Sequence, residues 1–375
     1  MSAPDSSHPR SPRGPDSPLP LTAEQFALLE SVARSAVGGA DIDPHALKVT
    51  IEAMEAAVGS LADRSETHQL RLARTAMREV RQAFRVFNRY RGIRKVAIFG
   101  SARTPTDHPD YAAAVEFGHL MGAAGWMAIT GGGEGIMRAG LEGPSTERSF
   151  GLVIHLPFES RANAVIAGDH KALRFRYFFT RKVAFLSHAD AIAAFPGGFG
   201  TLDELFEALT LIQTGRGALV PILLVEGSQA NGRPRGWWRD AERWMRRRLG
   251  DEGWISPEDL SLFHRASSPA DAAARIARFY RRYHSSRYVG DRLVIRMHST
   301  LPAAALKSIE SRFRPLIARG TLQLTQALAE ENGAHEDLPR VVFTHTRRDY
   351  GLVRLLIDAI NDVPLPRPKA LGRSS

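Results

Sequence analysis

The sequence contains no cysteine, which excludes disulfide bonds, thiolate metal sites and cysteine nucleophiles. It has no apolar run approaching the roughly 20 residues that span a bilayer, and its N-terminus lacks the apolar core of a secretion signal. The histidines show no ligand spacing, so no metal site is predicted. We therefore expect a cytoplasmic protein with no membrane partner and no metal or other cofactor.

Positive charge is what the sequence has in excess. The 50 lysines and arginines outnumber the 40 acidic residues, which gives a formal net charge of +10. This charge favours anionic partners, and nucleotides and nucleic acids both qualify. A basic, aromatic stretch at residues 237–248 is interpreted as a surface helix whose tryptophans pack inward. We therefore expect a nucleotide rather than a nucleic acid as the partner.

The most informative segment is PGGFGT at residues 196–201, which ends an apolar strand in a glycine turn and opens a helix. Glycines let an anion approach the backbone, and the amides of Gly200, Thr201 and Leu202 would be free donors at a positive helix end. Glu204 follows one turn later and would stand close to the bound group. The residues predicted to hold a phosphate are Gly197, Gly198, Gly200 and Thr201.

A second glycine turn lies upstream, at residues 130–137, and repeats the order of strand, glycines and helix. We expect its glycine triplet, Gly131, Gly132 and Gly133, to contact the same ligand. Ser101 follows another strand end, where its hydroxyl would either hydrogen-bond the ligand or cap the following segment.

These motifs resemble those of the Lonely Guy (LOG) family of nucleotide phosphoribohydrolases, older relatives of which were often labelled lysine decarboxylases. Residues 196–204 match the family signature P-G-G-x-G-T-x-x-E at every fixed position, and the glycine triplet and the pair Arg181-Lys182 match as well. The resemblance covers residues 94 to about 250. It implies that Arg181 and Glu204 are the catalytic pair, that Lys182 adds a second cation for the substrate, and that the protein forms a dimer or a larger homo-oligomer.

The activity implied by the resemblance is hydrolysis of the N-glycosidic bond of a purine nucleoside 5′-monophosphate, either AMP or its N6-substituted cytokinin form. Cleavage builds positive charge on the sugar, which a carboxylate stabilises. The alternative is a carrier that binds a nucleotide or a phosphorylated cofactor without cleaving it. Arg174 and Arg176 stand where small plant-type LOG proteins are acidic, and we expect them near the entering substrate.

Two other activities are disfavoured. The first glycine turn is not G-x-G-x-x-G, and no acidic residue closes the second strand to hold a ribose, which argues against a nicotinamide-dependent dehydrogenase. Amine decarboxylation would need a lysine for pyridoxal phosphate, and no lysine is singled out.

Apolar strands alternate with helices over residues 93–284, which predicts an α/β fold, a Rossmann-like doubly wound parallel sheet. The other predicted parts are a disordered leader (1–20), N-terminal helices (21–92) opened by a capping box at Thr22, a small α/β appendage (285–362) and a loose tail (363–375). The central strands are predicted at 96–99, 126–129, 151–156, 191–195 and 220–225, and the helices at 111–121, 136–141, 175–187, 202–213 and 237–249. In the appendage, strands are predicted at 293–297, 322–324 and 341–344, and helices at 303–317 and 350–360.

Overall fold

The structure is a computed structural model that describes residues 22–38, 42–156, 161–331 and 333–365. The predicted leader and residues 366–375 of the predicted tail lie outside these ranges. The chain divides into two compact units, one up to Arg78 and one from Glu79 onward. Among the described residues, no helix is both long and apolar enough to cross a membrane.

The first unit contains α1 (Ala23–Ala36), α2 (Pro44–Ala62) and the first turns of α3 (Thr67–Phe87). The predicted capping box is confirmed, because the Thr22 hydroxyl accepts from the Gln25 amide at 3.2 Å and the Gln25 side chain accepts from the Thr22 amide at 2.9 Å. A small apolar cluster joins α1 to α2 through Ala33, Leu47 and Ile51.

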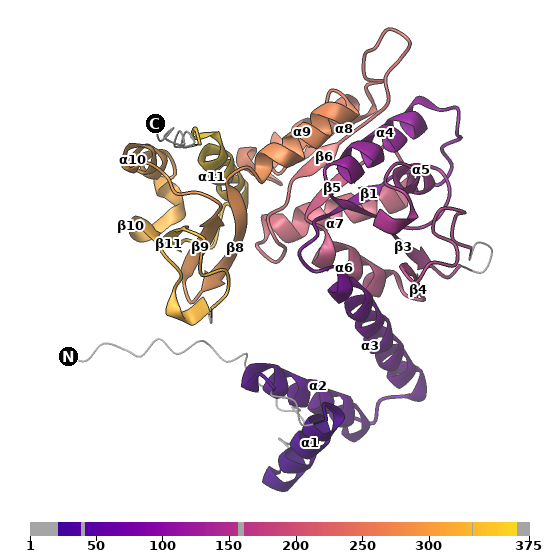
Figure 1. The fold of residues 1–375 in the computed structure, drawn as a ribbon, viewed down its shortest axis with the longest axis vertical. Coiled ribbons are helices and arrows are strands. Elements are labelled where there is room, and N and C mark those ends of the chain that lie inside the picture. The colour runs from indigo at the N-terminus through magenta and orange to yellow at the C-terminus, as the bar shows by residue number, and fades with distance from the viewer. Residues whose placement is uncertain (1–21, 39–41, 157–160, 332, 366–375) are drawn as a thin grey trace, which may run out of the picture. The chain divides into compact units, whose positions relative to one another are not determined.

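The second unit is built on a seven-stranded parallel sheet with the order β4-β3-β2-β1-β5-β6-β7 (Figure 1). Its strands are β1 (Lys95–Phe99), β2 (Met127–Thr130), β3 (Ser149–Ile154), β4 (Ala172–Phe175), β5 (Ala191–Ala194), β6 (Ile222–Leu224) and β7 (Phe263–Arg265). Near-continuous burial of the central strands means that both faces of the sheet are covered, as the fold prediction requires.

Helices cover both faces of the sheet. Alternate residues of β1 separate the two cores, because Val96 and Ile98 face one layer while Ala97 and Phe99 face the other. The first layer contains α4 (Pro109–Ala123), α5 (Ile136–Glu142) and α9 (Pro269–Phe279), and the second contains α6 (Phe178–His188), α7 (Phe199–Gln213), α8 (Trp237–Met245) and the last turns of α3. The predicted doubly wound α/β fold is therefore confirmed.

Two predictions in this region were wrong in detail. The helix predicted from residue 175 begins at Phe178, because the preceding residues form β4, in which buried Leu173 and Phe175 alternate with exposed Arg174. The two tryptophans that open α8 do not both pack inward: Trp238 is fully buried, but Trp237 is 37% exposed.

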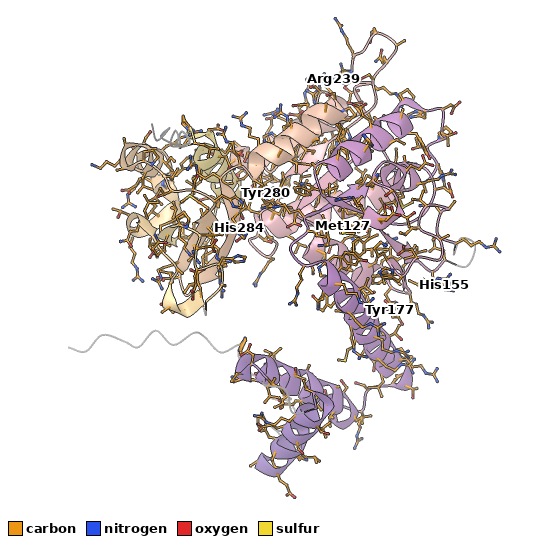
Figure 2. All side chains as sticks on the ribbon, viewed as in Figure 1. Met127, His155, Tyr177, Arg239, Tyr280 and His284 are labelled. Carbon is orange, nitrogen blue, oxygen red and sulfur yellow. The ribbon has the colours of Figure 1, made fainter. Side chains whose placement is uncertain are left out.

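The C-terminal part is a four-stranded antiparallel sheet with the order β10-β11-β9-β8. Its elements are β8 (Tyr283–Val289), β9 (Arg292–Met297), α10 (Ala303–Arg312), β10 (Ile317–Thr325), β11 (Arg340–His345) and α11 (Tyr350–Asp362). Tyr280 and His284 lie where this sheet joins the central domain (Figure 2). Phe279, Ile295 and Leu356 share one apolar core with the second layer of helices, so the appendage packs on the central domain.

Candidate functional site

The carboxyl ends of β1, β2 and β5 meet at the centre of the parallel sheet. The strand order runs outward from β1 in both directions, and a reversal of this kind opens a crevice beyond the strand ends. The Ser101 amide, after β1, donates to the Pro196 carbonyl after β5 at 3.2 Å, and the Ile136 amide, after β2, donates to the Ser101 carbonyl at 3.0 Å. The three loops therefore surround one crevice.

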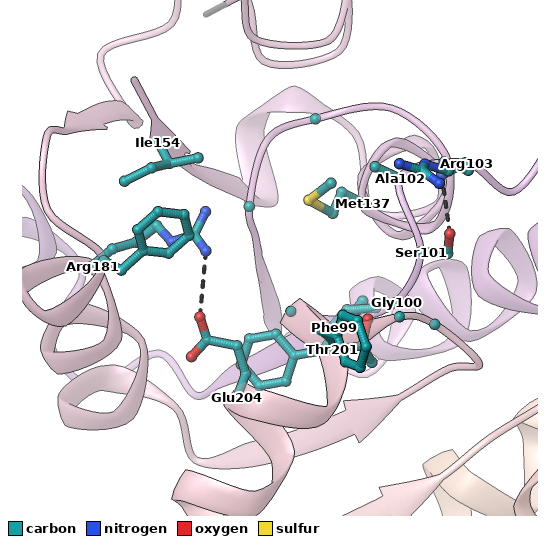
Figure 3. A pocket seen from close by; sticks show the side chains of 18 of the residues that line it. Phe99, Gly100, Ser101, Ala102, Arg103, Met137, Ile154, Arg181, Thr201 and Glu204 are labelled. Atoms are coloured by element: carbon teal, nitrogen blue, oxygen red, sulfur yellow. Dashed lines mark hydrogen bonds and ion pairs between the residues drawn. The ribbon is translucent and has the colours of Figure 1, made fainter. Parts of the chain in front are cut away.

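A cavity of about 810 Å³ occupies this crevice. It is lined by all but two of the predicted site residues, namely Ser101, Gly131, Gly133, Arg181, Gly197, Gly198, Gly200, Thr201 and Glu204. Figure 3 shows Arg181 and Glu204 facing each other on one side of the cavity, with Ser101 and Arg103 on the other. Apolar side chains form much of the remaining wall, including those of Met137, Val153, Ile154, Leu156, Phe178 and Phe185.

The turn that opens α7 is shaped to receive an anion. The helix begins at Phe199, and its N-cap residue Gly198 has no side chain to satisfy the first amides. The Leu202 amide already donates to the Gly198 carbonyl at 3.1 Å, so the prediction that it is a free donor was wrong. The first-turn amides that precede it are those of Phe199, Gly200 and Thr201. A Cβ built on Gly198 or Gly200 would meet no atom within 4 Å, which leaves open space beside these amides.

In the upstream glycine turn, Gly131 and Gly133 line the cavity and Gly132 is packed. Gly132 has φ +71° and does not line the cavity, since a Cβ there would lie 2.7 Å from the Val153 side chain. Asn163 is buried and holds this turn through two hydrogen bonds of 2.8 Å. Its side-chain Nδ2 donates to the Gly133 carbonyl, and its backbone N–H donates to the Gly132 carbonyl. Sequence reasoning missed Asn163, which lies far from the turn along the chain and carries no motif.

Arg181 and Glu204 form a buried ion pair at the cavity wall. The Arg181 Nη2 atom lies 3.4 Å from Glu204 Oε1, and the side chains are 13% and 6% exposed. Arg181 Nε and Glu204 Oε2 are buried without a hydrogen-bond partner among the described residues. Unpaired buried polar atoms are costly, so these two remain available for a ligand or water.

Burial changes the protonation of this pair. It raises the pKa of Glu204 to about 7, against the opposing influence of the Arg181 and Lys182 charges. Burial also lowers the pKa of Arg181, although the nearby Glu204 carboxylate works in the other direction. A carboxyl group with a pKa near neutrality can exchange a proton at physiological pH, which is what acid–base chemistry requires.

Lys182 does not line the cavity. Its Nζ lies 2.7 Å from Asp203 Oδ1 and also pairs with the carboxylate of Glu207, both on α7. The structure therefore brings Lys182 to the flank of α6 that faces α7, where it ties the helix of Arg181 to the helix of Glu204.

A further residue acts on the Arg181 helix. Glu79, on α3, is buried and accepts hydrogen bonds from the Arg176 amide at 2.7 Å and from the Thr180 hydroxyl at 2.5 Å. The first turn of α6 has no side-chain cap of its own, so Glu79 holds the end of the helix that carries Arg181. A carboxylate on the apolar face of α3, in line with Ala83 and Val86, was the available sequence signal.

The two arginines expected near the entering substrate lie elsewhere. Arg174 and Arg176 are exposed, and neither lines the cavity. Arg174 points outward because it alternates with buried residues of β4. Arg103 and Arg161 are the cavity-lining arginines besides Arg181 among the described residues.

Known proteins were compared with this chain by structure and by sequence. Solved structures similar to this chain include the molybdenum cofactor carrier protein from Chlamydomonas reinhardtii, which is 22% identical, with 49% of this chain and 96% of that chain covered and a TM-score of 0.33. The molybdenum cofactor binding protein from the phototrophic bacterium Rippkaea orientalis is 19% identical, with coverages of 50% and 96% and a TM-score of 0.35. The comparison with curated proteins found no match.

A protein-family comparison matches residues 134–276 to the family described as "Possible lysine decarboxylase". The matched region runs from the upstream glycine turn into α9 and includes both Arg181 and Glu204. It therefore confirms the resemblance predicted from the sequence: residues 134–276 are similar to the family described as possible lysine decarboxylases.

Proposed function

We propose that this protein hydrolyses the N-glycosidic bond of a purine nucleoside 5′-monophosphate, AMP or an N6-substituted AMP, to give the free base and ribose 5-phosphate. The observation that supports this most is that the buried Arg181–Glu204 pair and the uncapped amides of α7 line the same cavity. One end of a nucleotide can then bind at the glycine turn while its sugar reaches the carboxylate.

Each group in the cavity has a role in this reaction. The amides of Phe199, Gly200 and Thr201 bind the phosphate. The bond between C1′ and the base nitrogen breaks with its electron pair leaving on the base, a water oxygen bonds to C1′, and a proton from that water ends on the base. The Glu204 carboxylate stabilises the positive charge that develops on the sugar, and Arg181 orients that carboxylate.

The size of the cavity favours one alternative. At about 810 Å³ it lies in the upper part of the range for small-molecule sites, about 300 to 1,000 Å³, and so also suits a larger phosphorylated cofactor. In that case the protein would be a carrier that holds its ligand without cleaving it. The buried Glu204 carboxylate beside Arg181 favours the hydrolase, because cleavage needs a carboxylate next to the sugar whereas binding alone does not.

We further propose that the protein works in the cytoplasm as a homo-oligomer, a dimer or larger. Two apolar side chains that line the cavity are exposed, Phe199 at 94% and Phe178 at 50%, and the neighbouring Phe179 is 49% exposed. Burial of these rings against a second copy would remove them from water.

The experiment is a product assay. Purified protein is incubated with AMP, GMP, CMP, IMP and N6-isopentenyl AMP, and the free base is separated by chromatography. The proposal predicts base release from a purine monophosphate and its loss in Arg181→Ala. Tight retention of a nucleotide through gel filtration, with no base released by the wild-type protein, would instead identify a carrier.

A further inference from the structure

One face of α3 carries a line of arginines. Of the 21 residues of this helix, five are arginine and only Glu79 is acidic. Their spacings of three and four residues place them within an arc of about 80° on a helix with 3.6 residues per turn. We call this set the arginine stripe; it consists of Arg71, Arg74, Arg78, Arg81 and Arg85. Because α3 is one uninterrupted helix, helical periodicity alone aligns them over about 21 Å.

The arginine stripe has no internal counter-charge. All five side chains are exposed, and none forms an ion pair with a carboxylate in the part of the chain that the structure describes. Glu79, the one acid of the helix, is turned away and hydrogen-bonded to Thr180. The stripe is therefore a row of unneutralised guanidinium groups.

The second arginine-rich helix provides the contrast. On α8 and the π-helix that follows it, Arg243 pairs with Asp240 at 3.2 Å, Arg246 with Glu242 at 3.5 Å and Arg248 with Glu252 at 3.4 Å. These arginines are largely neutralised by acids on the same segment. On α3, by contrast, none of the five arginines of the stripe has an acidic partner among the described residues.

We propose that the arginine stripe binds the phosphate backbone of a nucleic acid, in a manner independent of base sequence. Arginine forks match phosphate oxygens, and a stripe of about 21 Å runs along about six nucleotides at about 3.4 Å per nucleotide. A helix lying on lipid must insert its apolar face. In the last turns of α3 that face is buried at Ala83, Val86 and Phe87, although Leu72, Met77 and Phe84 are exposed. A membrane surface is therefore disfavoured for the part of the stripe that carries Arg81 and Arg85, and the vesicle measurement below tests it.

This surface is separate from the nucleotide cavity, and the proposal does not depend on hydrolysis. It revises the expectation that nucleic acid is not a partner. None of the five stripe residues lines the cavity, so the two functions can be lost independently.

The test measures binding of fluorescently labelled RNA and DNA of about 20 nucleotides, single-stranded and duplex, by anisotropy against salt concentration. With five phosphate contacts, duplex affinity should fall about 500-fold between about 50 and about 200 mM salt, since each contact contributes about 0.9 to the logarithmic slope. The variant Arg74→Gln/Arg78→Gln/Arg81→Gln should lose only about tenfold over the same range, because about two contacts remain.

The matched control is Arg243→Gln/Arg246→Gln/Arg248→Gln, which removes the same net charge from paired arginines and should bind like the wild type. The triple Arg→Lys variant of the stripe keeps the charge and should keep the salt slope. Failure of the wild type to bind either nucleic acid would overturn the proposal. Equal losses in the two glutamine variants would do so as well, and so would binding to phosphatidylserine vesicles in place of nucleic acid.

Discussion

The two glycine turns of the sheet look alike in sequence and differ in structure. At the turn that opens α7, Gly198 and Gly200 border open space, and the first amides of the helix face a cavity. At the turn that opens α5, Gly132 and Gly135 have positive φ and pack tightly against neighbouring chain. Gly198 and Gly200 therefore make room for a ligand, whereas Gly132 and Gly135 make room for the protein.

The comparison gives a physical criterion for reading such turns. A glycine whose missing side chain leaves a void is a candidate for ligand contact, whereas one whose Cβ would strike backbone is there for packing. The carboxylates that follow the two turns divide in the same way. Glu204 is buried at the cavity, while Glu134 is 56% exposed and pairs with Arg138 on the surface.

The largest expected difference is in stability. A Cβ in Gly135→Ala would overlap the Ser101 carbonyl and the backbone of Ala102, at a residue with φ +62°. Left-handed backbone and overpacking together predict a loss of about 2 to 5 kcal/mol in the free energy of unfolding. Gly200→Ala, with no atom in the way, should stay within about 0.5 kcal/mol of wild type. Urea denaturation measures the free energy of unfolding of both variants, and equal losses would contradict the difference between the two turns.

The helix that carries Arg181, α6, begins in a third way. It has neither a glycine turn nor a side-chain cap, and Glu79 of α3 accepts the hydrogen bond from the Arg176 amide at its start. Glu79→Ala leaves the Arg176 amide without its partner and should cost about 1 to 3 kcal/mol of stability. It should also lower kcat more than it raises KM, because Arg181 is displaced while the phosphate site is intact. Steady-state kinetics beside urea denaturation test this, with Glu79→Gln, which still accepts from the Arg176 amide, expected to restore most of kcat.

A smaller effect is expected on substrate binding. The Cβ of Gly200→Ala enters the space beside the uncapped amides, so KM for the nucleotide should rise about tenfold, or about 1.4 kcal/mol, with little change in kcat. Gly125→Ala, in the connection between α4 and β2, serves as a distant control for a glycine that also borders open space, although its positive φ will lower stability. An unchanged KM in Gly200→Ala would show that the phosphate lies elsewhere.

The smallest expected effect is on pH dependence. Since burial raises the pKa of Glu204 to about 7 and the carboxylate is the active form, kcat/KM should rise with pH through about 7 and then level off. The Arg181 charge opposes that rise in pKa, so Arg181→Gln should move the inflection to higher pH. The pH profile of the residual activity measures the shift, and an inflection that moved to lower pH would contradict this account of the pair.

Much of the fold follows from local pattern. The apolar runs of β1, β2 and β5 and the amphipathic helices between them predict a parallel sheet, because such strands must be covered on both faces. β8 was not predicted: Tyr283–Val289 is a polar edge strand of the antiparallel sheet, largely half-buried, so its residues lack the apolar signal of a central strand. β4 was mistaken for the start of a helix, because its alternation of buried and exposed side chains extends over only four residues.

The residues of the candidate site also fall into those that local sequence predicts and those that it does not. Residues within the signature, such as Glu204 and Gly198, were predicted because their chemistry depends on neighbours in sequence. Glu79 and Asn163 were not, because each acts on a segment distant in the chain and becomes visible only once the sheet has assembled. Lys182 is a similar case. Its side chain pairs with acidic residues of α7 and does not reach the cavity that its neighbour Arg181 lines.

The central claim is that Glu204 acts on the molecule held by the glycine turn. The most direct test is the rate of base release from AMP by Glu204→Gln, beside Glu134→Gln as the matched carboxylate of the packed turn. The account predicts a fall of about 10² to 10⁴ in kcat for Glu204→Gln, with nucleotide still bound, and wild-type kcat for Glu134→Gln. Base release by Glu204→Gln at the wild-type rate would contradict it.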